Sequence, residues 1–196
     1  MKRTSISIGI DDGFFPPPPK KKGLTVLAGV LTLNLQPLRA ALERVTIDGL
    51  DGTERAVEIV KRLLEGESGD VAVFLDGISI AGFNYIDPQA LEESTGTMVV
   101  AVFRGPLSLE KIERALKKHF SDWEHRLSIY RLVVPRIKRA TTKRGRVYYY
   151  APSLDSIRAI RILEENQIYS PIPEPLRIAD MLASEVSRLL RRMRAL

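Results

Sequence analysis

The stretch that decides the fold is IGIDDG at residues 8–13, where a run of apolar residues leads directly into two aspartates and a glycine. Two other apolar segments end in the same way, TIDGLDG at residues 46–52 and VFLDG at residues 73–77. Strands that are almost continuously hydrophobic are central strands of a covered sheet. Ligands of open α/β sheets bind where such strands end. We therefore expect Asp11, Asp51 and Asp76 to meet at one end of a sheet.

Carboxylates that meet in this way repel one another unless a cation lies between them. Hard oxygen ligands suit Mg²⁺ or Mn²⁺. The pattern predicts a divalent metal site held by Asp11, Asp51 and Asp76, with Asp12 and Asp48 as further candidates. The alternative is that Asp-Gly pairs form turns or cap the next helix. For Asp48 the turn is the favoured interpretation.

The composition sets limits on the class of protein. A chain of 196 residues with 44% hydrophobic and 28% charged residues matches a single compact domain over residues 1–196. The absence of cysteine excludes disulfides, thiolate metal sites and cysteine nucleophiles, and two histidines are too few for an ordinary zinc site. Charges interrupt every apolar run before it reaches the roughly 20 residues that cross a bilayer. We expect a cytoplasmic protein with no membrane partner.

Charge is distributed unevenly along the chain. Residues 1–125 carry 15 basic and 18 acidic side chains, whereas the basic C-terminal portion, residues 126–196, carries 15 basic and 6 acidic ones. Positive surfaces bind polyanions through their phosphates. The asymmetry predicts a nucleic-acid partner, DNA or RNA, with Arg136, Lys138 and Arg139 among the residues that contact phosphate. A solvated basic surface is the alternative, and the oligomeric state stays open.

Hydrophobic periodicity and capping residues give the order of elements. Three strands in an antiparallel meander come first, and helices and strands alternate after them. The expected strands are 5–11, 24–35, 42–48, 71–76, 97–103, 127–134 and 146–150. The expected helices are 53–65, one that starts at Asp87-Pro88, 108–120, 154–166 and 175–194.

This order is the ribonuclease H-like layout, an α/β fold with a mixed sheet of three meander strands plus parallel strands and with helices on both faces. Four segments carry a closer resemblance: IGIDDG (8–13), VFLDGISIAGFN (73–84), VVAVFR (99–104) and PEPLRIAD (173–180). Together they resemble an archaeal family, number 99 among the domains of unknown function, which is similar to endonuclease V. The resemblance covers almost the whole chain.

The resemblance implies roles for individual residues. Asp11 and Asp76 match metal-binding aspartates of endonuclease V, and Asp51 falls near a glutamate that precedes its first long helix. Arg104 lies near a basic residue at the end of the corresponding strand of that enzyme, and we expect Arg104 to face the scissile phosphate. Two metal ions on shared carboxylates would support in-line attack of water on phosphorus.

The chain also departs from endonuclease V. Its tyrosine-rich wedge is replaced by LNLQPLRAAL at residues 33–42, and its late histidine by YAPSLDS at residues 150–156. We therefore expect little preference for inosine over adenosine. The first hypothesis is a metal-dependent nuclease, and the alternative is a noncatalytic nucleic-acid-binding or assembly module that keeps the fold. Phosphotransfer is a weaker third, because no glycine-rich phosphate loop follows the first strand.

Overall fold

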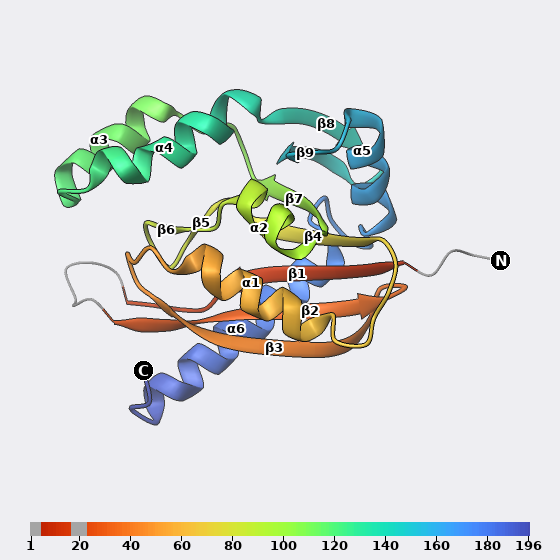
Figure 1. Cartoon of the computed structure of the whole chain (residues 1–196), viewed down its shortest axis with the longest axis horizontal. Helices are drawn as coiled ribbons and strands as arrows, with labels where there is room; N and C mark the ends of the chain where they lie inside the picture. Colours follow the sequence, from red (N-terminus) through yellow and green to blue (C-terminus); the bar gives the residue numbers. More distant parts are fainter. Residues whose placement is uncertain (1–4, 17–22) are drawn as a thin grey trace.

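The computed structural model describes residues 5–16 and 23–196. Seven strands form one sheet in the order β3-β2-β1-β4-β7-β9-β8, and a short hairpin, β5-β6, lies apart from it (Figure 1). The strands are β1 (Ile6–Asp12), β2 (Leu24–Leu33), β3 (Gln36–Thr46), β4 (Val71–Asp76), β5 (Ser79–Ile80), β6 (Asn84–Tyr85), β7 (Met98–Phe103), β8 (Lys138–Thr142) and β9 (Gly145–Tyr150). The helices are α1 (Gly52–Leu63), α2 (Pro88–Thr95), α3 (Leu109–His119), α4 (Trp123–Val133), α5 (Ser156–Glu165) and α6 (Glu174–Arg192), with a 3₁₀ turn, η1 (Val134–Arg136).

The sheet is mixed. β1, β2 and β3 pair antiparallel, β1, β4 and β7 pair parallel, and β9 and β8 continue the sheet antiparallel. One core contains α1 to α4 residues against the sheet, and a second core contains residues of α5 and α6 on the other face. The predicted mixed α/β sheet with helices on both faces is confirmed.

Side chains alternate between the two faces of β1, and each face packs against a different helix. Ile6, Ile8 and Ile10 belong to the core under α1. The intervening side chains face α6, which starts close to the strand: a methyl group at Gly9 would come within 2.2 Å of the Pro175 backbone. Glycine therefore allows α6 to approach the sheet beside Asp11.

Local signals placed most elements correctly. The Asp87 carboxylate accepts hydrogen bonds from two backbone amides of α2, and the Ser108 hydroxyl accepts one from the Lys111 amide in α3. β3 begins at Gln36, earlier than expected, because this edge strand has few buried residues to reveal it. β8 was not expected.

The expected strand at residues 127–134 is wrong, because α4 occupies this region. Its fully buried positions are 126, 127, 129, 130 and 133, and spacings of three and four residues belong to one side of a helix. The basic C-terminal portion thus starts with a helix packed on the core. None of the helices in the described ranges is long and apolar enough to cross a membrane.

Candidate metal centre

Two of the predicted aspartates lie side by side at the ends of neighbouring strands. β1 and β4 are parallel and pair Ile10 with Leu75, so Asp11 and Asp76 occupy the next position on each strand. Parallel neighbours in register place their side chains on the same face, here the face that α6 covers. Asp11 is 8% exposed, and its carboxylate accepts a hydrogen bond of 2.9 Å from the Asp12 amide.

The electrostatics of this group are unusual for carboxylates. Burial and the charges of Asp76 and Asp12 together raise the pKa of Asp11 to about 8, against the lowering effect of the hydrogen bond from the Asp12 amide. Burial also raises the pKa of Asp12 to about 6, against the lowering effect of the Ala81 amide. We call Asp11, Asp12 and Asp76 the strand-end carboxylates. Burial and neighbouring carboxylates both oppose the ionisation of Asp11 and Asp12.

A fourth acid lies near this group on α6. The charge of Asp180 contributes to the raised pKa of both Asp11 and Asp12. Sequence reasoning missed Asp180 as a site residue, because an acid on an amphipathic helix normally faces solvent. The available signal was its position as the last residue of the PEPLRIAD segment, one of the four that carried the family resemblance.

Arg104 supplies a positive charge at the edge of the site. It follows β7, and its Nη2 lies 3.0 Å from Oδ2 of Asp76. The hydrogen bond to Asp76 raises the pKa of Arg104. The Arg104 side chain is 75% exposed, so it remains open to a ligand from solvent. Its contact with a phosphate stays a prediction.

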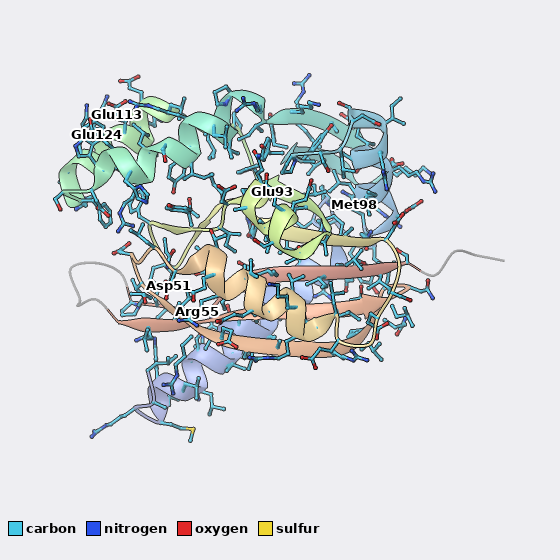
Figure 2. The ribbon with its side chains drawn as sticks, in the orientation of Figure 1. Asp51, Arg55, Glu93, Met98, Glu113 and Glu124 are labelled. Atoms are coloured by element: carbon cyan, nitrogen blue, oxygen red, sulfur yellow. The ribbon has the colours of Figure 1, made fainter. Side chains whose placement is uncertain are left out.

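The other two candidate ligands, Asp48 and Asp51, have hydrogen-bond partners of their own, and we call them the loop carboxylates. Asp51 accepts hydrogen bonds from the Thr46 hydroxyl at 2.9 Å and from the Asn84 side-chain amide at 2.7 Å. Figure 2 shows Asp51 at the start of α1, with Arg55 on the next turn. Asp48 has a φ of 56° and accepts from the Phe83 amide at 2.9 Å, as expected of a turn residue.

Arg126 holds the loop that carries these two acids. Its guanidinium donates to the backbone oxygens of Asp48, Gly49 and Phe83, each at 2.9 Å. It also pairs with Asp122 and lies 4.3 Å from the centre of the Phe120 ring. With a side chain only 6% exposed, Arg126 has a structural role, although the sequence counted it in a basic surface.

The carboxylate oxygens of the candidate site are chemically suited to a hard divalent cation, but they do not surround a position for one. Within residues 5–16 and 23–196, no three acidic or histidine side chains converge, as they stand, with the spacing that holds a metal ion. The buried carboxylate of Asp11, surrounded by like charges, is nevertheless the kind of group that a divalent cation stabilises. Asp11 and Asp76 are the residues that would hold the ion, with Asp12 and Asp180 next to them.

Residues 4–187 match the family model described as Endonuclease dU. The chain belongs to this family. A UPF0215 protein of Pyrococcus furiosus is 38% identical over 198 residues, covering 96% of this chain and 95% of its own length. A UPF0215 protein of Sulfurisphaera tokodaii is 34% identical over 183 residues, covering 93% and 94%.

Solved structures extend the Endonuclease dU match to the fold. A protein of unknown function from Archaeoglobus fulgidus superposes with a TM-score of 0.76 at 26% identity, covering 94% of this chain and 98% of the other. Human ENDOV gives 0.63 at 16% identity, covering 97% and 87%. Ciona intestinalis endonuclease V, solved with a 24mer DNA containing an inosine, gives 0.62 at 12% identity, covering 98% and 88%. The predicted resemblance to an archaeal family with an endonuclease V-like fold is confirmed.

The other three predicted phosphate-binding residues of this Endonuclease dU family member lie at or next to the β8 edge of the sheet. Arg136 ends η1, and Lys138 and Arg139 begin β8, the edge strand. Because successive side chains on a strand point to opposite faces, Lys138 and Arg139 leave β8 on opposite faces of the sheet. The structure therefore separates residues that the sequence grouped together.

Proposed function

We propose that the protein is a divalent-metal-dependent endonuclease that hydrolyses a phosphodiester bond of nucleic acid at the strand-end carboxylates. The observation that carries this proposal is the position of Asp11 and Asp76 on adjacent parallel strands, with Asp180 nearby on α6. Buried like charges of this kind destabilise a fold unless they serve a ligand. A divalent cation is the ligand that their chemistry suits.

The proposal assigns a task to each residue. Asp11 and Asp76 hold Mg²⁺ or Mn²⁺, and Asp12 and Asp180 supply further negative charge. When bound, the cation provides activation of water and charge stabilisation at the leaving oxygen. Arg104 pairs with Asp76 and is exposed, so its remaining N–H groups are placed to bind a phosphate oxygen of the substrate.

The family description and the structural neighbours support a class of substrate. The description names dU, and the Ciona endonuclease V was solved with DNA containing an inosine. We propose that the substrate is nucleic acid with a deaminated base and that deoxyuridine is preferred over inosine. The replacement of the endonuclease V wedge at residues 33–42 is consistent with a weak response to inosine.

The experiment compares matched oligonucleotides that contain deoxyuridine, inosine or no modified base, each with Mg²⁺, Mn²⁺ or EDTA. We expect metal-dependent cleavage that is fastest on the deoxyuridine strand. Asp11→Asn and Asp76→Asn should slow it by roughly 10²- to 10³-fold, the range seen when a group that stabilises transition-state charge is lost. Asp180→Asn should slow it less, because Asp180 is exposed and supplies charge from outside the buried group.

Asp70→Asn is the matched control. It makes the same chemical change just before β4, at the opposite end of the strand that carries Asp76, and its side chain is 69% exposed. Cleavage by this variant should equal that of the wild type. Equal rates for Asp76→Asn and Asp70→Asn would refute the assignment of the active site.

The noncatalytic nucleic-acid-binding module remains the second candidate, because the acidic side chains do not converge as they stand. Titration calorimetry with Mn²⁺ distinguishes the two. Binding to the wild type that is lost in Asp11→Asn supports the nuclease. Oligonucleotide binding without Mn²⁺ binding or cleavage supports the module.

A further inference from the structure

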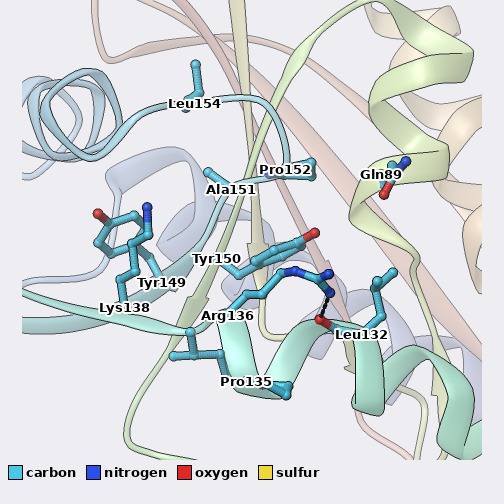
Figure 3. Close-up of a pocket in the computed structure, with 11 residues that line it drawn as sticks. Gln89, Leu132, Pro135, Arg136, Lys138, Tyr149, Tyr150, Ala151, Pro152 and Leu154 are labelled. Atoms are coloured by element: carbon cyan, nitrogen blue, oxygen red, sulfur yellow. Dashed lines mark hydrogen bonds between the residues drawn. The ribbon is translucent and has the colours of Figure 1, made fainter.

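A second candidate ligand site lies near the β8 edge of the sheet, several strands away from β1. A cavity of about 440 Å³ opens between the start of α2, η1 and the strands β8 and β9 (Figure 3). This volume falls within the range of small-ligand pockets, roughly 300–1,000 Å³. Eleven residues line the cavity, and two of them, Arg136 and Lys138, are cationic while none is acidic. Its lining therefore favours an anion.

The polar groups in the cavity are donors. Arg136 donates through Nη1 to the Leu132 backbone oxygen and makes no other hydrogen bond within the described ranges. Lys138 Nζ lies 3.0 Å from the Ser156 hydroxyl. Figure 3 shows Arg136 and Tyr150 directed into the same space, with Gln89 across from them. A planar guanidinium with unused N–H groups is a common phosphate-binding group, and the Lys138 ammonium adds a second positive charge from the other face of the β8-β9 edge.

Tyr150 adds a third donor. Its side chain is 6% exposed, and burial raises its pKa, while the nearby charge of Arg136 lowers it and those of Asp87 and Glu92 raise it. The hydroxyl thus keeps its proton at neutral pH and can donate to an anion.

The cavity wall lies two strands away from Asp76, one of the strand-end carboxylates. Tyr149 in its wall pairs with Val102, and Val102 pairs with Asp76 on the next strand. Two strand spacings separate the backbones of Tyr149 and Asp76, roughly 10 Å. The backbones at the two places are therefore close, although Tyr150 belongs to the face that α1 to α4 cover and Asp76 to the face that α6 covers.

We propose that this cavity binds a nucleotide of the substrate strand, and that Arg136 and Lys138 contact phosphates of that strand from the two faces of the β8-β9 edge. The proposal rests on the proposed function, because it assigns the strand that the carboxylates cut. It also divides the basic segment: Arg136 and Lys138 bind phosphate, whereas Arg139, on the opposite face of β8, does not.

The test measures binding of a fluorescent 20-nucleotide single strand by anisotropy in EDTA, over a series of salt concentrations. On a single strand, each lost phosphate contact reduces the magnitude of the slope of log affinity against log salt by about 0.7. We expect this decrease for Arg136→Gln and Lys138→Gln and about twice the decrease for the double variant. Arg139→Gln is the matched control, with the same charge change on the neighbouring exposed residue, and it should leave the slope unchanged. Thermal melting of each variant confirms that it is folded.

Three outcomes would overturn the proposal. One is absence of binding by the wild type, and another is an equal decrease for Arg139→Gln and Lys138→Gln, which would indicate diffuse surface charge. The third is stabilisation of the wild type, but not of Lys138→Gln, by thymidine monophosphate or inorganic phosphate at micromolar concentration, which would assign the cavity to a free small anion. Because cleavage cannot occur in EDTA, these results are independent of whether the carboxylates are catalytic. If the protein binds the single strand through Arg136 and Lys138 but does not cleave nucleic acid with Mg²⁺ or Mn²⁺, the nuclease proposal is rejected. The assignment of the cavity is then kept.

Discussion

Two groups of acidic residues that look alike in the sequence have opposite surroundings in the structure. Among the strand-end carboxylates, Asp11 is buried next to like charges and its pKa rises to about 8, while Asp76 pairs with Arg104. The loop carboxylates accept hydrogen bonds from Thr46, Asn84 and Phe83. An Asp-Gly pair after an apolar segment is thus compatible with a ligand-binding group and with a turn. The number of hydrogen-bond donors near each carboxylate distinguishes the two.

The loop carboxylates are also fixed from outside their own segment. Arg126, which is far away in the sequence, binds three backbone oxygens of the loop and of the neighbouring β5-β6 hairpin. Among the described residues, Asp11 and Asp12 together have fewer hydrogen-bond partners than the two loop carboxylates, and burial raises the pKa of both. We therefore expect substitutions in the loop network to change stability, and substitutions among the strand-end carboxylates to change metal binding.

The largest effect on stability is expected for Arg126→Met. Methionine keeps contact with Phe120 but leaves three partly buried carbonyl groups without their donor. At about 1–3 kcal/mol for each unsatisfied group, with partial relaxation, the free energy of unfolding should fall by about 3–5 kcal/mol. Urea denaturation in EDTA measures the change.

Arg131→Met is the control for this variant, because it lies on the same helix with a side chain 57% exposed and only a long contact to Glu113. Its stability should stay close to that of the wild type. Once folded, Arg126→Met should bind Mn²⁺ like the wild type. A loss of Mn²⁺ affinity at unchanged stability would mean that the loop belongs to the metal site.

The sequence predicted the fold well because the fold depends on local signals. Continuous apolar strands, the Asp87 and Ser108 caps and the meander were all readable from short segments. The error at residues 127–134 arose because a short apolar run does not distinguish a strand from a helix. In α4 the distinguishing residue is Arg126, whose burial depends on carbonyl oxygens 77 and 78 residues away.

The residues of the candidate site were harder to predict, because their positions depend on contacts between segments that are far apart in the sequence. Asp11 and Asp76 were identified because each ends a central strand, and strand order follows from topology. Asp180 reaches the group only through the packing of α6 on β1, which Gly9 permits and which no local pattern reveals. Hydrogen bonds to Asp51 likewise come from Asn84, whose position depends on the β5-β6 hairpin.

The next largest effect concerns pH in the absence of metal. The Asp11 pKa is higher in the folded protein, about 8, than the ordinary value of 3.8. Its protonated form therefore contributes stability that is complete below the ordinary value and is lost as pH rises through about 8. With one proton bound more tightly by the folded state, the free energy of unfolding should fall by about 2–3 kcal/mol between pH 6 and pH 9.

Denaturant titrations in EDTA at several pH values test this prediction, and Asp11→Asn should remove most of the decline. The stabilisation that Mn²⁺ adds should show the opposite trend. It should be larger at pH 8 than at pH 6 in the wild type, because Mn²⁺ binds the ionised carboxylate. A flat pH profile for the metal-free wild type would contradict the description of Asp11 as a buried acid without a compensating charge.

The smallest effect is expected at Asp51, and it bears most directly on the comparison between the two groups. Asp51→Ala removes acceptors for the Thr46 hydroxyl and the Asn84 amide, so the free energy of unfolding should fall by about 1–2 kcal/mol, while calorimetry should show unchanged Mn²⁺ affinity. Asp51→Asn separates charge from hydrogen bonding, because the amide oxygen can still accept from Thr46. If that variant keeps its stability but loses Mn²⁺ binding, Asp51 is a metal ligand as the sequence predicted. The loop carboxylates would then have to move toward Asp11 when the metal binds, and their hydrogen bonds in the metal-free protein would be a resting arrangement rather than their function.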